Sequence, residues 1–306
     1  MKIIRPIFWN DINFISLILY PMTIITYFIN YLKTFNKKKN FFIKTICVGN
    51  IYLGGTGKTP LAIQINKILR KKNPVFIKKN YKDQIDEQKL LKLNGNLICT
   101  NLRYNGVQIA ESKKYKVGIL DDGLQDKSIN YNISIVCFNS TSGIGNGFLL
   151  PAGPLRENIT VIKNYDAIFL NGQNKNKKLE KTLKNINKNI KIFHGKYIPK
   201  NIKKFNLNKK FIFFSGIGNP DEFEKTLKNY KFKIKEKFIF PDHYNYSGKD
   251  LNHIKKIAKN KKLDIITTEK DFMRIGKKNR KNIKYLKIEL RIQNISKFSK
   301  FLKDRL

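Results

Sequence analysis

Short apolar runs alternate with helical patterns through most of the chain. The strand-like runs of the first part lie at 41–49, 74–78, 96–100, 116–120, 133–138 and 165–170. Helical patterns fill several of the gaps, most clearly at 58–72 and 83–93. This alternation predicts an α/β fold, with a mostly parallel sheet covered by helices on both faces.

The alternation restarts after a polar stretch rich in Lys and Asn near 196–209, which we interpret as a linker. Strand-like runs follow at 210–216, 231–240, 263–268 and 283–290, with helices predicted at 221–229, 248–260 and the C-terminus. The pattern predicts three parts: an N-terminal apolar helix at 1–40, a core domain at 41–200 and a smaller C-terminal α/β domain at 201–306.

The N-terminal segment 12–32 contains no charged side chain and is followed by four lysines within 33–39. As a helix it would be about 30 Å long, enough to cross a bilayer. Polar residues dilute the run and Pro21 would kink it, so a helix lying in the interface is an alternative, and a buried core helix is a third. No small-residue cleavage site follows, which disfavours a signal peptide. We expect membrane contact, with the lysines near anionic headgroups on the cytoplasmic side.

The net charge is strongly positive, because 62 Lys and Arg residues outnumber 22 Asp and Glu residues, for a formal charge of +40. Such a charge suits nucleic acid or an anionic membrane surface. The excess is mostly Lys, accompanies abundant Asn and Ile, and is spread along the chain, as A/T-rich codons would produce. We favour this compositional explanation and expect no specific nucleic-acid partner.

The three cysteines, Cys47, Cys99 and Cys137, each lie in a short apolar run. Their spacing matches neither a disulfide framework nor a metal site. We therefore expect buried thiols in a protein of a reducing compartment.

The stretch YLGGTGKTP at 52–60 follows a predicted strand and precedes a predicted helix, which is the context of a phosphate-binding loop. Its glycines let backbone N–H groups turn toward phosphate oxygens, and the helix N-terminus adds partial positive charge. Lys58 can reach the β- and γ-phosphates, and Thr59 can bind Mg²⁺. Tyr52 occupies the usual first glycine position, which shapes the entry turn. We predict a P-loop NTPase-like core whose nucleotide contacts come from Tyr52, Leu53, Gly54, Gly55, Thr56, Gly57, Lys58 and Thr59.

Two further segments supply acidic residues. Asp121 and Asp122 end an apolar strand, and a carboxylate at the carboxyl end of a parallel strand beside a phosphate loop suits Mg²⁺. A tight Asp-Asp-Gly turn is the alternative. The Gly- and Pro-rich segment 143–157 ends in Arg156, which suits phosphate oxygens, and Glu157, which suits Mg²⁺. We predict a magnesium site formed by Thr59, Asp121, Asp122 and Glu157.

Among the three histidines, His243 is the catalytic candidate. It lies in the loop FPDHYNYSGKD beside Asp242, between a strand and a helix N-terminus. We expect a structural role for His194 and a solvated helix face for His253.

Six segments together resemble the tetraacyldisaccharide 4'-kinase family, whose members phosphorylate a lipid A precursor. They are VGNIYLGGTGKTP, DDGLQ, GNGFLLPAGPLRE, FSGIG, FPDHYNYS and ITTEKD, in the family's order. The resemblance implies a P-loop core joined by a linker to a smaller α/β domain, and an N-terminal helix that docks on the membrane. It also implies ATP and Mg²⁺ as cofactors and an acylated disaccharide phosphate lipid as acceptor, at the cytoplasmic face of the bacterial inner membrane.

The resemblance further implies the catalytic pair. The stretch IDEQKLL at 85–91 aligns with the family's Gly-Asp-Glu-Pro-Leu-Leu segment, which makes Asp86 the counterpart of the catalytic Asp and His243 its partner. A sugar hydroxyl must lose its proton as it attacks the γ-phosphorus, so Asp86 would accept the proton and His243 would orient Asp86. From the residues alone, Asp86 is an ordinary exposed helix residue.

The chain departs from the family's pattern at several positions. KKNY at 78–81 stands where Ser-Arg-Gly-Tyr is usual, so Lys79 keeps the charge of the Arg without its bidentate fork, and Asn80 takes the Gly position. Asp126 and Asn158 replace a His and a Pro. These changes bear on contacts to the acceptor's phosphate and leave the nucleotide site intact.

We therefore expect a membrane-associated, monomeric, Mg²⁺-dependent kinase that phosphorylates the 4'-hydroxyl of a tetraacyldisaccharide 1-phosphate. Two alternatives stay open. A P-loop ATPase that switches conformation at a membrane, of the partitioning or targeting type, would need the loop and Asp121 but not Asp86 or His243. A non-enzymatic nucleic-acid binder would rest on the charge alone, without the support of a basic motif with interleaved aromatic residues.

Overall fold

The chain forms two compact units, each built from separate stretches of sequence, in a computed structural model that describes residues 6–35, 37–81 and 84–306. The core unit comprises 6–80, 91–196 and 290–306, and the small unit comprises the described residues of 81–90 and 197–289. The segments predicted at 1–40 and 83–93 lie partly outside the described residues. The predicted parts 1–40, 41–200 and 201–306 are meant as regions that each fold on their own, and this division stays a prediction.

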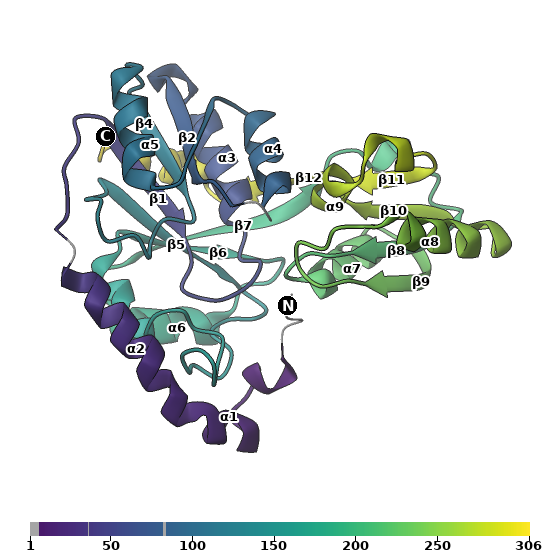
Figure 1. The fold of residues 1–306 in the computed structure, drawn as a ribbon, viewed down its shortest axis with the longest axis horizontal. Helices are drawn as coiled ribbons and strands as arrows, with labels where there is room; N and C mark the ends of the chain where they lie inside the picture. Colours follow the sequence, from purple (N-terminus) through teal and green to yellow (C-terminus); the bar gives the residue numbers. More distant parts are fainter. Residues whose placement is uncertain (1–5, 36, 82–83) are drawn as a thin grey trace. The chain divides into compact units, whose positions relative to one another are not determined.

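An eight-stranded sheet forms the centre of the core unit (Figure 1). Its strands lie in the order β12-β7-β6-β5-β1-β4-β2-β3. Their bounds are β1 (Lys44–Gly49), β2 (Pro74–Lys79), β3 (Leu97–Thr100), β4 (Val117–Asp121), β5 (Ile133–Asn139), β6 (Ala167–Asn171), β7 (Lys191–Pro199) and β12 (Ile288–Ile292). Each neighbouring pair from β7 to β3 is parallel, which confirms the predicted mostly parallel sheet.

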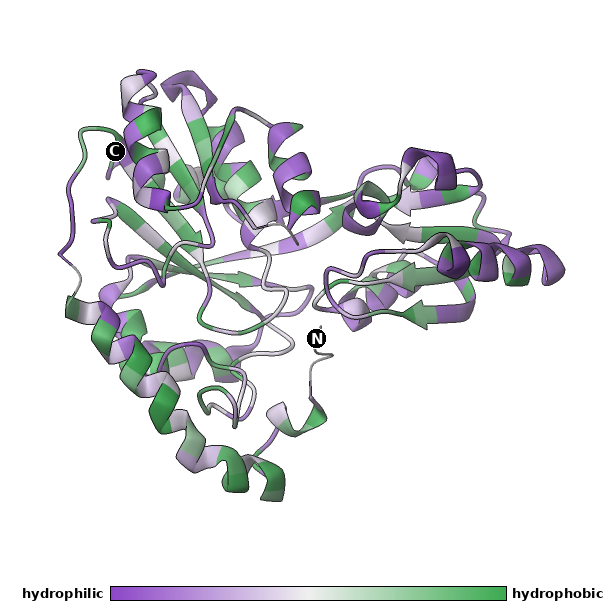
Figure 2. Cartoon of the chain, in the orientation of Figure 1, coloured by the Kyte–Doolittle hydropathy of each residue, from purple (hydrophilic) through white to green (hydrophobic). Residues whose placement is uncertain are grey.

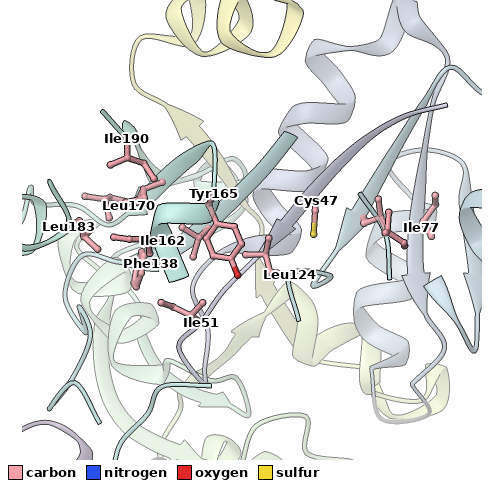
Figure 3. Close-up of a cluster of buried hydrophobic side chains, with 14 of the residues drawn as sticks. Cys47, Ile51, Ile77, Leu124, Phe138, Ile162, Tyr165, Leu170, Leu183 and Ile190 are labelled. Carbon is pink, nitrogen blue, oxygen red and sulfur yellow. The ribbon is translucent and has the colours of Figure 1, made fainter. Parts of the chain in front are cut away.

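Near-continuous apolar sequence explains why the central strands are buried. Strands β4, β5 and β6 are buried along their whole length, and β1 is buried after its first residue. Helices α3 (Lys58–Ile68) and α5 (Arg103–Ser112) pack on β1, β2, β3 and β4, and α6 (Lys177–Ile186) contributes to the same core unit. Figure 3 shows part of this apolar cluster, including Cys47, Ile77, Phe138 and Tyr165.

The small unit has its own four-stranded sheet, in the order β11-β10-β8-β9. The strands are β8 (Lys210–Ser215), β9 (Lys233–Ile239), β10 (Asp264–Thr268) and β11 (Ile283–Leu286), and the described pairs are parallel. Helices α7 (Pro220–Asn229), α8 (Gly248–Asn260) and α9 (Glu269–Arg274) connect them. Two apolar clusters stabilise the sheet. The first turns of α4 (Ile85–Lys92) also belong to this unit.

The structure differs from the sequence-based expectation at three places. The run at 283–290 forms two strands that belong to different sheets, β11 and β12. The stretch near 196–209 begins as the end of β7, whose partly exposed residues dilute the apolar signal. The expectation of three buried cysteines is wrong for Cys99, which is exposed because β3 is an edge strand.

The apolar N-terminal segment forms two helices, α1 (Phe14–Leu19) and α2 (Thr23–Leu32), and the C-terminal end of the chain forms α10 (Ile295–Lys303). A 3-10 turn that contains Pro21 separates α1 from α2, at the position where the sequence predicted a kink. Figure 2 shows apolar residues along both N-terminal helices, and most of their large apolar side chains are exposed. The stretch Phe14–Phe35 is long and apolar enough to cross a bilayer by length and composition.

Candidate active site

Strand β1 carries the glycine-rich loop to the carboxyl edge of the core sheet. Gly54 and Gly57 have φ angles of 138° and 90°, a backbone region that favours glycine. Gly57 precedes the first residue of α3, Lys58, so the loop ends at a helix N-terminus. Asn50 holds the loop from inside, because its side-chain amide donates to the carbonyl oxygens of Tyr52 and Gly54. This is the strand–loop–helix arrangement that the sequence predicted.

Tyr52 stabilises the loop by packing. It is buried against Leu149 and Leu155, and its backbone forms a bridge with Leu155. The neighbouring Leu53 N donates to the Pro154 oxygen at 2.8 Å. An aromatic side chain at the first loop position therefore fastens the loop to the 149–157 segment, a contact that glycine could not make.

Asp121 lies beside the loop because β4 pairs with β1 in a register that places Val48 opposite Asp121. Asp121 is 1% exposed, and its Oδ2 accepts hydrogen bonds from Thr59 Oγ1 at 3.0 Å and from Lys78 Nζ at 2.8 Å. Its Oδ1 is buried and has no hydrogen-bond partner among the described residues. An orphaned carboxylate oxygen next to a threonine hydroxyl fits a hard cation such as Mg²⁺.

The other two predicted metal ligands have basic or amide partners. Asp122 accepts a hydrogen bond from Arg156 at 3.0 Å, and its Oδ1 lies 3.9 Å from Lys58 Nζ. Burial would raise the pKa of Asp122, but the charges of Lys58 and Arg156 outweigh burial and lower it.

Glu157 accepts a hydrogen bond from Gln125 at 2.8 Å and pairs with Lys127 at 3.1 Å. No three His, Cys, Asp or Glu side chains of the described ranges cluster as a metal site. The structure thus brings Thr59 and Asp121 into contact, whereas Asp122 and Glu157 are held by other partners.

The small unit contains the predicted catalytic pair. Asp86 lies in the first turn of α4 and is 2% exposed, not an exposed helix residue. Its Oδ1 is 3.3 Å from His243 Nδ1. His243 has a φ of 56°, and its backbone N–H donates to the Gly216 oxygen at 3.1 Å. The structure therefore brings Asp86 and His243 together across 157 residues of sequence.

Arg274 is a site residue that the sequence did not indicate. At the end of α9, its guanidinium donates to Asp86 Oδ2 at 2.8 Å and to Asp271 Oδ1 at 2.9 Å. Asp271 is buried and also accepts a hydrogen bond from Tyr246 at 2.8 Å. The ITTEKD motif ends at Asp271, and Arg274 follows three residues later. Residues three apart on a helix lie side by side, so this spacing was the available sequence signal for Arg274.

The remaining two histidines have other partners. His194 Nε2 is 3.0 Å from Glu180 Oε1, which fits the structural role that the sequence suggested. His253 is on an exposed position of α8, and its ring contacts Phe238.

The charges around Asp86 determine its protonation. Burial alone would raise the pKa of Asp86, but the hydrogen bond with His243 and the charges of Lys270 and Arg274 lower it from 3.8 to about 2. Because the folded-state pKa is depressed, Asp86 contributes stability above about pH 4, and this contribution is lost as the pH falls through about 2. A shift of this size corresponds to about 2 kcal/mol.

We expect Asp86→Asn to remove this pH dependence. The difference in free energy of unfolding between wild type and variant should shrink by about 2 kcal/mol from pH 5 to pH 2, measured by urea unfolding. Asp264→Asn is the control, because Asp264 pairs with the exposed Lys209 and Lys284. A constant difference between wild type and Asp86→Asn over this range would contradict the depressed pKa.

The N-terminal helices are tied to the segment that packs on the phosphate loop. Thr26 Oγ1 donates to the Leu150 oxygen at 2.7 Å, and Asn30 Nδ2 donates to the Arg156 oxygen at 2.7 Å. Trp9 Nε1 donates to the oxygen of Pro151 at 3.0 Å. Two of the polar residues that dilute the apolar run, Thr26 and Asn30, therefore face the 149–157 segment.

We expect the double substitution Thr26→Val and Asn30→Leu to loosen α2. Each lost hydrogen bond leaves a partly buried carbonyl without its donor, at a cost of about 1 kcal/mol. Hydrogen exchange in α2 should accelerate at least about fivefold. Thr34→Val is the control, since its hydroxyl donates to the Tyr31 oxygen of the same segment. Equal exchange rates in wild type and the double variant would show that these contacts do not hold α2.

Comparisons with known proteins agree with the sequence-based resemblance. The family profile described as tetraacyldisaccharide-1-P 4'-kinase matches residues 15–306. The chain is 48% identical to the tetraacyldisaccharide 4'-kinase of Pelagibacter ubique, with 96% of this chain and 95% of that protein covered. It is 35% identical to the protein of the same name from Rickettsia typhi, with 96% of each covered.

A solved structure is similar to the whole chain. The crystal structure of LpxK from Aquifex aeolicus, in complex with ATP, matches with a TM-score of 0.70 and 24% identity, over 95% of this chain and 99% of that chain. This likeness confirms the predicted fold, a P-loop NTPase-like core with a smaller α/β part and an N-terminal apolar helix.

Proposed function

Because the chain belongs to the tetraacyldisaccharide-1-P 4'-kinase family, we propose that it transfers the γ-phosphate of ATP to the 4'-hydroxyl of a tetraacyldisaccharide 1-phosphate, a late step of lipid A biosynthesis. The observation that carries the proposal is the contact between the buried Asp86 and the partly buried His243. Phosphoryl transfer requires that the acceptor hydroxyl lose its proton, and the pair of Asp86 and His243 would supply the base that takes it. An ATPase that only switches conformation has no need of such a pair.

On the nucleotide side, Lys58 and the amides of the glycine-rich loop would hold the β- and γ-phosphates. Thr59 and Asp121 would hold Mg²⁺, with Asp122 and Glu157 acting directly or through water. When bound, the ion neutralises charge that develops on the phosphate oxygens. Arg156, which pairs with Asp122, would place a second cation near the phosphates.

On the acceptor side, Asp86 would bind the sugar hydroxyl. Its pKa of about 2 keeps the carboxylate ionised at physiological pH, so it can accept a hydrogen bond from the hydroxyl. Such a weak base takes the proton late, as the bond to phosphorus forms and the hydroxyl becomes more acidic. His243 orients one carboxylate oxygen, and Arg274 positions the other.

A lipid acceptor and the need for ATP together indicate that the protein acts at the cytoplasmic face of the bacterial inner membrane, where ATP is available. The exposed apolar residues of α1 and α2 would enter the bilayer interface, while the lysines after α2 would contact anionic headgroups. Thr26 and Asn30 bond to the 149–157 segment, and a 3-10 turn at Pro21 interrupts the regular α-helix, so we favour a segment that lies on the membrane over one that spans it. We propose that a monomer suffices for the reaction.

We expect the apolar face of α1 and α2 to drive vesicle binding. Replacing the exposed Ile18, Ile24 and Phe28 with Asn should lower binding to phosphatidylglycerol vesicles at least about tenfold, because each apolar side chain contributes about 1.5 kcal/mol or more when buried. Ile295→Asn, an exposed apolar position of α10, is the control. Unchanged co-sedimentation of the triple variant would contradict membrane docking through this face.

ATP consumption with and without the lipid tests the proposed function against the switching ATPase. In detergent with Mg²⁺, the kinase releases ADP only when tetraacyldisaccharide 1-phosphate is present. A partitioning or targeting ATPase would hydrolyse ATP at a rate that does not depend on this lipid. Equal ADP release in both conditions would overturn the proposal.

A further inference from the structure

Lys78 is a buried cation inside the nucleotide site. It lies near the end of β2, is 1% exposed, and is among the largest fully buried side chains of the described residues. Its ammonium group bonds to Asp121 Oδ2 at 2.8 Å, the same oxygen that accepts the Thr59 hydroxyl. Lysine is almost never fully buried unless it is paired, so this contact determines where the side chain lies.

The buried charge of Asp121 needs a positive partner. An unpaired carboxylate at this depth would be strongly unfavourable, and the Lys78 ammonium supplies the compensation. The charge of Lys78 also reaches Asp122, where it helps to lower the pKa. The proposed metal-binding carboxylate is therefore already neutralised by a side chain of the protein.

Two cations on one carboxylate repel each other. A divalent ion held by Asp121 Oδ1 would share this carboxylate with the ammonium on Oδ2, in a buried setting where charges are screened little. The phosphates of a nucleotide would add enough negative charge to offset that repulsion. Without the nucleotide phosphates, the repulsion between the ion and the Lys78 ammonium is not offset in this way.

We propose that Lys78 determines when the metal binds: its ammonium excludes a free divalent cation from Asp121, so that the ion enters only together with the nucleotide phosphates. The inference rests on the proposed nucleotide site, and it assigns a role in metal selectivity to a residue outside the phosphate loop. Lys78 acts through Asp121 and does not need to touch the substrate.

Binding of Mn²⁺ alone, followed by electron paramagnetic resonance, tests this inference. Without nucleotide, Lys78→Met should bind Mn²⁺ at least about tenfold more tightly than wild type, because the competing charge is gone. The double variant Lys78→Met/Asp121→Asn should lose this gain. Lys44→Met, at the exposed start of β1, is the matched control and should behave as wild type. Equal Mn²⁺ affinity in wild type and Lys78→Met would overturn the inference.

Thermal unfolding gives a second readout that needs no activity. In EDTA, Lys78→Met should melt at a lower temperature than wild type, and Mn²⁺ should raise its Tm more than that of wild type. If Lys78→Met does not fold even with Mn²⁺ while the double variant folds, a metal cannot replace the ammonium and the inference is overturned. Wild type that binds no Mg²⁺–ATP would instead overturn the proposed function.

Discussion

Asp86→Asn is expected to lower kcat for lipid phosphorylation by a factor of about 10² to 10⁴, the usual contribution of a general base. Asn keeps the size of the side chain but cannot accept the proton of the sugar hydroxyl. ATP affinity should stay within about twofold of wild type, because the side-chain partners of Asp86 are His243 and Arg274, and Asp86 has no part in the phosphate loop. Steady-state kinetics and calorimetric titration with ATP measure the two quantities.

Two comparisons make the Asp86 result specific. His243→Ala should cause a smaller loss of kcat, since His243 orients the carboxylate but does not take the proton. Asp264→Asn, which removes a partly exposed carboxylate of the same unit that pairs with Lys209 and Lys284, should leave kcat unchanged. A kcat for Asp86→Asn within threefold of wild type would show that the proton is removed elsewhere.

Lys58→Met is expected to weaken ATP binding by a factor of about 100 or more. The substitution removes the ammonium that reaches the β- and γ-phosphates. It also removes a cation 3.9 Å from Asp122, whose carboxylate would then repel the phosphates. Isothermal titration with a non-hydrolysable ATP analogue measures the change in Kd.

Lys67→Met is the matched control, because Lys67 is exposed on the same helix α3. It should bind the analogue as wild type does, and far-UV circular dichroism should show both variants folded. A folded Lys58→Met protein with the Kd of wild type would place the nucleotide outside this loop.

The nucleotide site was the easier part to predict from the sequence. Its glycines, Lys58 and Thr59 are contiguous, and Asp121 ends an apolar strand whose place in a parallel sheet follows from the alternation of strands and helices. Local sequence is enough when residues of a site are consecutive, because the chain itself holds them together. Tyr52 is understood only in the structure, where its packing against Leu149 and Leu155 is visible.

The acceptor side could not be derived from local patterns. Asp86 and His243 are 157 residues apart, and residue types alone gave no reason to pair them; the resemblance to a known family did. Arg274 carries little sequence signal of its own, because one basic residue is not distinctive in a lysine-rich chain. Lys78 was visible only as part of a departure from the family's motif, and its burial beside Asp121 emerged from the strand register.

Phosphorylation of a lipid disaccharide at the 4'-hydroxyl is tested most directly by transfer of radiolabel from γ-labelled ATP to tetraacyldisaccharide 1-phosphate, in detergent with Mg²⁺. We predict a labelled lipid whose new phosphate is a monoester at the 4'-position, formed by wild type and nearly absent with Asp86→Asn. Label that appears only in free phosphate, with the lipid unchanged, would contradict the account.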